Sequence, residues 1–213
     1  RDIALLLAKE DIALWAVFFL VPVGRGQKDG MLDADGHEEV FNLLYDLSKE
    51  MPYDIKTTAA QHYRRVVIER RRKESLGPAP AAGRVMEPGG WTSPDFLTSK
   101  ARPAVDASEF VGRSVKGIND GNGFVFISHH GEVWPSGFLP ISGGNVRQRS
   151  LVDIYRNAPL FKEIRDYSKL KGKCGWCDHR DLCGGSRSRS YGVTGDYMAS
   201  EPYCAYVPEK SEK

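Results

Sequence analysis

The four cysteines of this 213-residue chain follow the pattern C-x2-C-x5-C-x20-C near its C-terminus. Four converging thiolates can ligate either a tetrahedral zinc ion or a [4Fe–4S] cube. Structural zinc usually takes its ligands from two short C-x2-C pairs, and this chain has only one such pair. A cube presents four separate iron corners, which suits a ligand loop that wraps around it. The spacing therefore favours the cube, and zinc or two disulfides are the alternatives. The candidate ligands are Cys174, Cys177, Cys183 and Cys204.

The composition sets limits on the kind of protein. With 41% hydrophobic and 27% charged residues, the chain is ordinary for a globular protein with one large or two small domains. A net charge of +2 gives no electrostatic case for binding nucleic acid or membranes. The apolar run at residues 12–23 is too short to cross a bilayer. Clustered cysteines without a signal peptide predict a reducing, cytoplasmic location.

Residues 1–74 show the alternation of helix and strand that is typical of βα units. A continuous apolar run at residues 14–21 predicts a strand buried on both faces, and residues 53–58 predict a second strand. Asp35 and Glu38 form a capping-box pattern for the helix that follows. Residues 61–74 predict a basic helix. Ile3, Leu6 and Leu7 begin an apolar helix face without a cap. We therefore expect the chain to be a portion of a longer protein.

The rest of the chain divides into two parts. Residues 75–120 are rich in glycine and proline and lack periodicity, which predicts a linker or an active-site cover. Residues 121–213 predict a small α+β domain with a hairpin turn at His129 and His130, two short helices and the cysteine loop. The helices are expected to begin with a cap at Ser150 and with Pro159 at the first helical position. A metal centre would add folding energy to so thin a core.

Three segments together resemble the C-terminal part of a radical S-adenosylmethionine enzyme. They are GFVFISHHGEVWPSGFLPISGGNVRQRSLVDIY, KCGWCDHRDLCGGSRSRSY and the late EPYCAYVP. The segments FFLVPVGRG and IKTTAAQHYRRV also resemble the end of the partial barrel in these enzymes. The resemblance is strongest to members that modify haem: the haem d1 biosynthesis enzyme and the decarboxylase of the alternative haem pathway. It implies an α/β fold, the end of a partial (β/α)6 barrel followed by a twitch or SPASM domain.

By this resemblance the four cysteines ligate one auxiliary [4Fe–4S] cluster. Many SPASM domains hold a second auxiliary cluster, but this chain has Ser136 and Arg187 where two of its cysteines would stand. The C-x3-C-x2-C triplet that defines the family is also absent from this sequence, and so are the first strands of the barrel. We therefore expect that this chain alone does not generate a radical.

The resemblance places the end of the strand at residues 14–21 near the adenosine of S-adenosylmethionine. Val21, Pro22, Gly24 and Arg25 are thus candidate cofactor contacts, with a plain turn as the alternative. If the substrate is a tetrapyrrole, its propionates need cationic partners. The candidates directly after the second strand are His62, Tyr63, Arg64 and Arg65, and the alternative is that these arginines belong to a solvated basic helix face.

Other polar residues have weaker functional interpretations. His129 and His130 are expected to be solvated in their turn. His179 could donate a hydrogen bond to a cluster sulfur or lie exposed in the loop. Arg187 and Arg189 could offset the negative charge of the cluster or be ordinary surface residues.

The sequence thus predicts a portion of a radical enzyme whose parent modifies side chains of a haem-type tetrapyrrole and requires an electron donor. A peptide-modifying maturase is the enzymatic alternative. The other alternative is a non-catalytic binding module stabilised by zinc or a cluster. An open barrel edge could also pair with a second chain.

Overall fold

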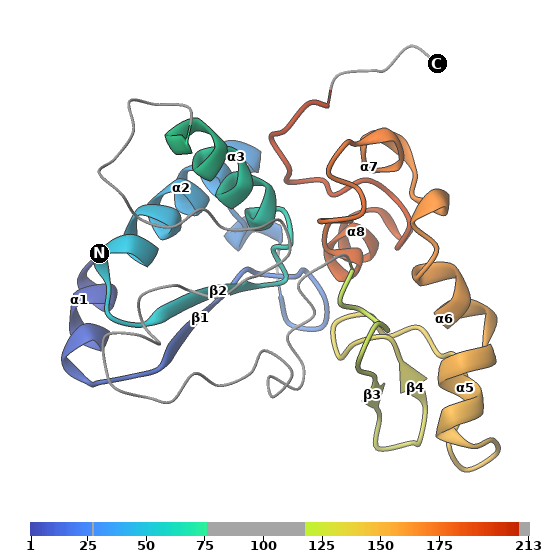
Figure 1. Ribbon diagram of the computed structural model, residues 1–213. Coiled ribbons are helices and arrows are strands. Elements are labelled where there is room, and N and C mark those ends of the chain that lie inside the picture. The colour runs from blue at the N-terminus through green and yellow to red at the C-terminus, as the bar shows by residue number, and fades with distance from the viewer. Residues whose placement is uncertain (27, 76–117, 209–213) are drawn as a thin grey trace.

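The computed structural model describes residues 1–26, 28–75 and 118–208 (Figure 1). The predicted linker at residues 75–120 lies outside the described residues except at its ends. We refer to residues 1–75 as the first lobe and to residues 118–208 as the second lobe. None of the helices in these ranges has both the length and the apolar character needed to cross a membrane.

The first lobe is a short βαβ unit with two further helices. Strands β1 (Leu14–Phe18) and β2 (Asp54–Thr58) pair in parallel, with Leu14 opposite Asp54 and Phe18 opposite Thr58. A parallel pair requires a long crossover, and α2 (Ala34–Glu50) supplies it. The remaining elements are α1 (Asp2–Lys9), the 3-10 turn η1 (Lys28–Gly30) and α3 (Tyr63–Ser75). The predicted helix and strand order is confirmed.

The core of the first lobe lies between the strand pair and α2 and α3. Phe41, Leu44 and Leu47 of α2 are buried in this core. Two details of the prediction are wrong. Phe18 at the end of β1 is 52% exposed, so the strand is not buried on both faces. In α1 Ala4 is buried and Leu7 packs against the core as predicted, whereas Ile3 and Leu6 of the predicted face are exposed.

The N-terminus of α2 is capped two residues earlier than the sequence suggested. The Asp33 side chain accepts a hydrogen bond of 2.7 Å from the backbone N–H of Gly36. Asp35 instead lies inside the first turn of the helix. The predicted capping pair Asp35 and Glu38 is therefore wrong, and Glu38 instead pairs with Arg65 of α3.

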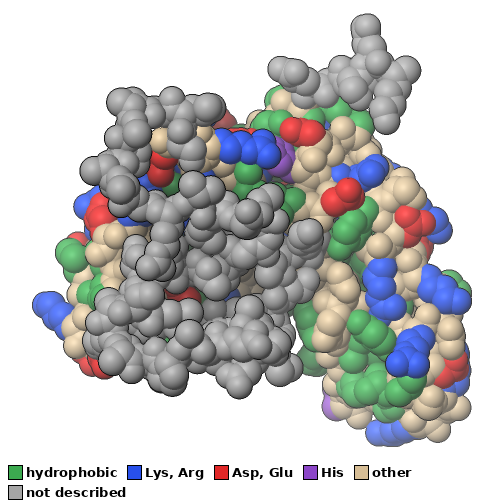
Figure 2. Space-filling view, in the orientation of Figure 1, with side chains coloured by type: hydrophobic (Ala, Val, Ile, Leu, Met, Phe, Trp, Pro, Cys, Tyr) green, Lys and Arg blue, Asp and Glu red, His purple; other side chains and the backbone are tan. Residues whose placement is uncertain are grey.

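The second lobe is built from short elements (Figure 1). Strands β3 (Phe126–Ile127) and β4 (Val133–Trp134) pair antiparallel, as predicted. Four helices and one 3-10 turn follow: α5 (Leu151–Asn157), α6 (Pro159–Ile164), η3 (Tyr167–Lys169), α7 (Gly172–Trp176) and α8 (Arg187–Thr194). The Ser150 cap and the position of Pro159 are both confirmed. Figure 2 shows apolar side chains at the end of this lobe that carries β3 and β4, where Phe126 and Ile127 are exposed.

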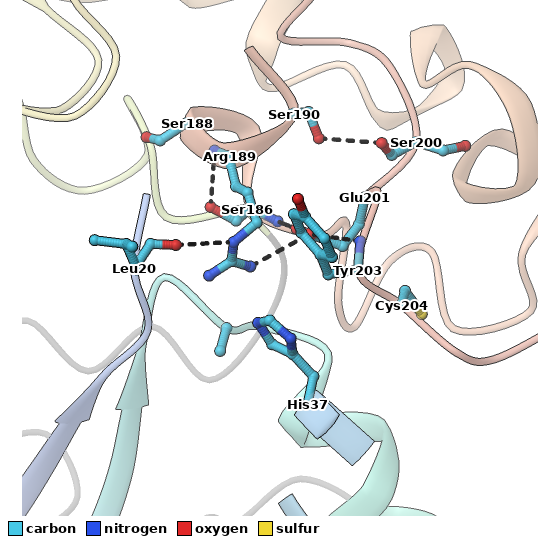
Figure 3. Close-up of polar contacts among 12 residues, drawn as sticks. Leu20, His37, Ser186, Ser188, Arg189, Ser190, Ser200, Glu201, Tyr203 and Cys204 are labelled. Carbon is cyan, nitrogen blue, oxygen red and sulfur yellow. Dashed lines mark hydrogen bonds and ion pairs between the residues drawn. The ribbon is translucent and has the colours of Figure 1, made fainter. Parts of the chain in front are cut away.

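The two lobes meet at α8, where charged side chains are buried. Arg189 is 0% exposed and Glu201 is 1% exposed, and Arg189 Nη1 lies 3.3 Å from Glu201 Oε1. Arg189 Nε also donates a hydrogen bond of 3.2 Å to the carbonyl oxygen of Leu20, just after β1 (Figure 3). Because Leu20 belongs to the first lobe, this arginine joins the lobes while its charge is balanced within the second lobe.

Glu201 has further partners that keep it ionised. Its carboxylate accepts hydrogen bonds from the backbone N–H groups of Ser186, at 2.8 Å, and Tyr203, at 3.3 Å. Burial alone would raise the pKa of Glu201, but Arg189 and its other positive neighbours lower it below the ordinary value. The His37 ring of the first lobe stacks on Tyr203, with centroids 5.6 Å apart. The junction therefore combines a compensated charge pair with aromatic packing.

The corrected cap gives a test of helix α2. Asp33→Ala should lower the free energy of unfolding by about 1 kcal/mol, because the N–H of Gly36 loses its acceptor. Asp35→Ala is the matched control and should cost less, since Asp35 contributes only through the helix dipole. Urea unfolding followed by circular dichroism compares the two. A larger loss for Asp35→Ala would contradict the assignment.

Glu201→Gln tests the buried pair at the junction. It should lower the free energy of unfolding by about 3 kcal/mol or more, because the buried Arg189 would keep its charge without a counter-ion. Glu50→Gln is the control: Glu50 pairs with Arg1 at the same 3.3 Å, but both side chains are largely exposed. Exposed pairs contribute at most about 1 kcal/mol. Equal losses in urea unfolding would show that burial of the pair is unimportant.

Candidate functional site

All four cysteines line one pocket at the junction of the lobes. Cys174 lies in α7, Cys177 is the C-cap of that helix, and Cys183 follows one loop later. Cys204 comes from the extended segment after α8. Each thiol is partly buried, and none forms a disulfide. The alternative of two disulfides is therefore absent from this structure, and the fold brings together residues that the sequence separates by up to 30 positions.

Two glycines close the loop behind Cys183. Gly184 and Gly185 have φ angles of +65° and +67°, a left-handed conformation that favours glycine. A Cβ atom on Gly184 would lie 2.6 Å from Ile118, and one on Gly185 would lie 2.8 Å from Glu201. Both glycines line the pocket. The Cys-Gly-Gly sequence therefore lets the chain turn sharply at Cys183.

Backbone N–H groups already point at two of the sulfurs. The N–H of Glu201 donates to Cys174 Sγ and the N–H of Gly185 donates to Cys183 Sγ, both at 3.3 Å. Burial raises the pKa of Cys177 to about 11 and of Cys183 to about 12. Thiols of this kind lose their protons on binding a metal, so binding is coupled to proton release.

The four cysteines share the wall of the pocket with other side chains. Within residues 1–26, 28–75 and 118–208, no three His, Cys, Asp or Glu side chains are placed to hold a single metal ion. Cationic side chains complete the wall: Arg65, Lys173 and Arg180 all line the pocket. Such a donor set fits a centre larger than one ion and negatively charged overall.

One wall of the pocket comes from the first lobe. His62, directly before α3, and Arg65 on its first turn both line the pocket. Arg65 pairs with Glu38 and with Glu69, the latter at 2.8 Å. Arg64 donates a hydrogen bond of 3.1 Å to the carbonyl oxygen of Leu182, in the cysteine loop. The interpretation of these two arginines as a solvated face is wrong, because Arg65 is buried in ion pairs within the first lobe and Arg64 bonds to the second lobe.

The other residues predicted after β2 are buried as well. His62 is 1% exposed and Tyr63 is 3% exposed. Burial lowers the pKa of His62 to about 3, so the ring is neutral. The sequence placed these residues correctly after a strand but gave no sign that both are buried.

The candidate S-adenosylmethionine contacts lie where β1 ends. Val21 is buried, whereas Gly24, with a φ angle of +60°, and Arg25 are exposed. Pro22 packs against α8, since a Cβ atom on Gly192 would lie 3.0 Å from the Pro22 carbonyl oxygen. These residues do not line the cysteine pocket.

The remaining histidines behave differently from one another. His129 and His130 are exposed in the hairpin turn, as expected. His179 is 9% exposed, and its Nε2 lies 3.3 Å from Glu69 and 3.6 Å from Asp178. The exposed-loop interpretation of His179 is therefore wrong.

Arg187 and Arg189 are not surface residues either. Both are 0% exposed, yet neither lines the cysteine pocket. Arg187 Nη1 donates hydrogen bonds to the carbonyl oxygens of Tyr197 and Ala199. Ser136 hydrogen bonds with Ser188 at 3.1 Å. These two positions, where a second cluster would need cysteines, are thus occupied by buried polar contacts.

Glu201 is a residue of the pocket that the sequence did not single out. It lines the pocket, bonds to Cys174 through its backbone and balances Arg189 through its side chain. Its position three residues before Cys204, in EPYC, was the only available signal.

Comparison with known proteins finds relatives that match nearly the whole chain. No family model matches the chain, and no solved structure gives a significant match. The AdoMet-dependent heme synthase of Methanosarcina barkeri is 35% identical over 205 residues, which are 96% of this chain and 51% of that protein. The Pre-heme d1 synthase of Dinoroseobacter shibae is 29% identical over 118 residues, 54% of this chain and 28% of that protein. The PqqA peptide cyclase of Methylobacterium sp. is 38% identical over 65 residues, 30% and 17% respectively.

The match to the heme synthase of Methanosarcina barkeri extends over nearly the whole chain. The chain spans about half the length of that relative. The shorter matches fall to enzymes named for haem d1 formation and for peptide cyclisation. Over nearly its whole length the chain is thus similar to proteins named AdoMet-dependent heme synthase.

Proposed function

We propose that this chain contributes the auxiliary-cluster portion of a radical S-adenosylmethionine enzyme that modifies the side chains of a haem-type tetrapyrrole. The observation that carries the proposal is the pocket lined by all four cysteines. Its support from the sequence is a relative named AdoMet-dependent heme synthase that matches 96% of the chain.

Cys174, Cys177, Cys183 and Cys204 would each ligate one iron of a [4Fe–4S] cluster. Four thiols spread around a pocket suit the four corners of a cube, and Arg65, Lys173 and Arg180 would offset its negative charge. A single auxiliary cluster is consistent with the hydrogen-bonded Ser136 and the buried Arg187. The partial barrel and the twitch or SPASM domain are the fold that we propose for the two lobes.

S-adenosylmethionine would contact Val21, Pro22, Gly24 and Arg25 at the end of β1. When bound to a complete enzyme of this family, it supplies a 5′-deoxyadenosyl radical that abstracts a hydrogen atom from the substrate. The exposed Arg25 is free of the packing that buries Val21. An electron donor is required for this chemistry, and the auxiliary cluster would position the substrate or pass an electron.

The substrate contacts stay a prediction. Arg64 and Arg65 already bond to the protein, so a propionate would have to compete with these partners. His62 and Tyr63 are too deeply buried to meet a substrate in this arrangement, and Tyr63 belongs to the core of the first lobe. Pairing of the open strand edges with a second chain also remains a prediction, as does the linker at residues 75–120.

Peptide modification is the second candidate, favoured by the 38% identity to a PqqA peptide cyclase over 30% of the chain. The much longer match to heme synthase makes the tetrapyrrole the better proposal. A zinc-stabilised binding module is the non-catalytic alternative, because zinc also accepts four thiolates.

Metal analysis of the chain purified without oxygen tests the centre. We expect about four irons and four sulfides per chain, with absorbance from thiolate-to-iron charge transfer. Cys183→Ala should abolish most of the iron and sulfide together, because it removes one ligand of the cube. Ser136→Ala is the control and should leave both unchanged, since Ser136 lies outside the cysteine pocket.

One zinc per chain without sulfide would contradict the cluster and leave a structural tetrathiolate. Loss of iron in Ser136→Ala equal to that in Cys183→Ala would show that the metal does not depend on these cysteines. Binding of the isolated tetrapyrrole, followed by its absorbance, separates the substrate proposal from that of a peptide.

A further inference from the structure

His62 reaches the cysteine pocket from the opposite lobe with its polar atoms unused. The side chain is 1% exposed and lines the pocket. Neither Nδ1 nor Nε2 has a hydrogen-bond partner. In either tautomer a neutral imidazole carries one N–H, so a buried donor is left without an acceptor whichever nitrogen bears the proton. Buried donors are rarely left in this state in folded proteins.

Aromatic neighbours hold the ring in place without satisfying it. The Phe41 ring packs edge-on against His62, with centroids 4.6 Å apart and an interplanar angle of 80°. The His37 ring lies 5.6 Å away, and its own Nδ1 bonds to the Asp33 carbonyl oxygen at 2.8 Å. These contacts pack the imidazole from the first-lobe side and use neither of its nitrogens.

The chemical character of the pocket identifies the missing acceptor. Its wall contains four sulfurs, two of which already receive backbone N–H groups from Glu201 and Gly185. A bound [4Fe–4S] cluster would add sulfide acceptors at the centre of the same pocket. Hydrogen bonds to sulfur stabilise the more negative, reduced state of a cluster and so raise its reduction potential.

We propose that His62 donates a hydrogen bond to a sulfur of the auxiliary cluster and raises the reduction potential of that cluster. This inference rests on the proposed function, since it requires the cluster to be present. In this role His62 contacts the cluster and does not contact the reacting substrate. It also makes the potential depend on the docking of the two lobes, since His62 belongs to one lobe and the cysteines to the other.

His179 is the residue that the sequence suggested for this role. Its Nε2 already lies close to the carboxylates of Glu69 and Asp178. Those oxygens are stronger acceptors than a sulfide, so His179 is engaged in holding α3 to the cysteine loop. His62 has no such competing partner.

The test compares three substitutions of His62 with a control in the full 213-residue chain, loaded with iron and sulfide. His62→Phe keeps a ring and removes the donor. His62→Gln and His62→Asn place an amide N–H near the positions of Nε2 and Nδ1. His130→Phe is the control, because His130 is exposed in the hairpin turn and lies away from the pocket. Iron content, sulfide content and a redox titration followed by electron paramagnetic resonance are measured for each.

We expect all the variants to hold about four irons. His62→Phe should lower the ratio of reduced to oxidised cluster at a fixed solution potential about tenfold, a shift of about 59 mV for a one-electron couple. One of the two amide variants should restore much of this loss, and His130→Phe should match the unsubstituted chain. Rescue by an amide is not expected of a merely structural ring.

Three other outcomes are informative. An intact cluster with an unchanged potential in His62→Phe would overturn the inference and leave the proposed function standing. Loss of iron in all three His62 variants, but not in His130→Phe, would make His62 a structural residue and also overturn it. An unsubstituted chain that holds no iron or sulfide would instead defeat the proposed function itself.

Discussion

The buried Glu201 carboxylate is the interaction on which both the junction and the pocket depend. It balances Arg189, which reaches across to Leu20, and it accepts the N–H groups of Ser186 and Tyr203. Its own backbone N–H bonds to Cys174. An isolated buried charge is very costly, so this carboxylate is tolerable only while its partners stay in place. One residue thus links the start of α8, the contact between the lobes and a cysteine.

The same arrangement explains why the candidate metal centre belongs to both lobes. The cysteines come from the second lobe, whereas His62 and Arg65 form a wall from the first. Arg64 and His179 bind the two sides together through Leu182 and Glu69. A cluster in this pocket would therefore stabilise the docked arrangement of the lobes, because it binds only the state in which the cysteines are assembled.

Much of the local structure could be predicted from the sequence. The strand at residues 54–58, the hairpin, Pro159 at a helix start and the Ser150 cap all depend on neighbouring residues. The errors arise where distant residues decide. Asp35 fitted a capping pattern, but Glu38 is drawn to Arg65 on another helix. The charge of Arg189 suggested a surface residue, but its side chain is fully buried.

The sequence by itself supplied the cysteine spacing and the match to a relative over 96% of the chain, because both are properties of the linear order. Only the tertiary structure decided which other side chains face the pocket. His62 and Glu201 lie 112 and 27 residues from Cys174, and no periodicity relates them to it. Their placement follows from the packing of α3 against the cysteine loop and from the pairing of buried charges, which depend on contacts between lobes.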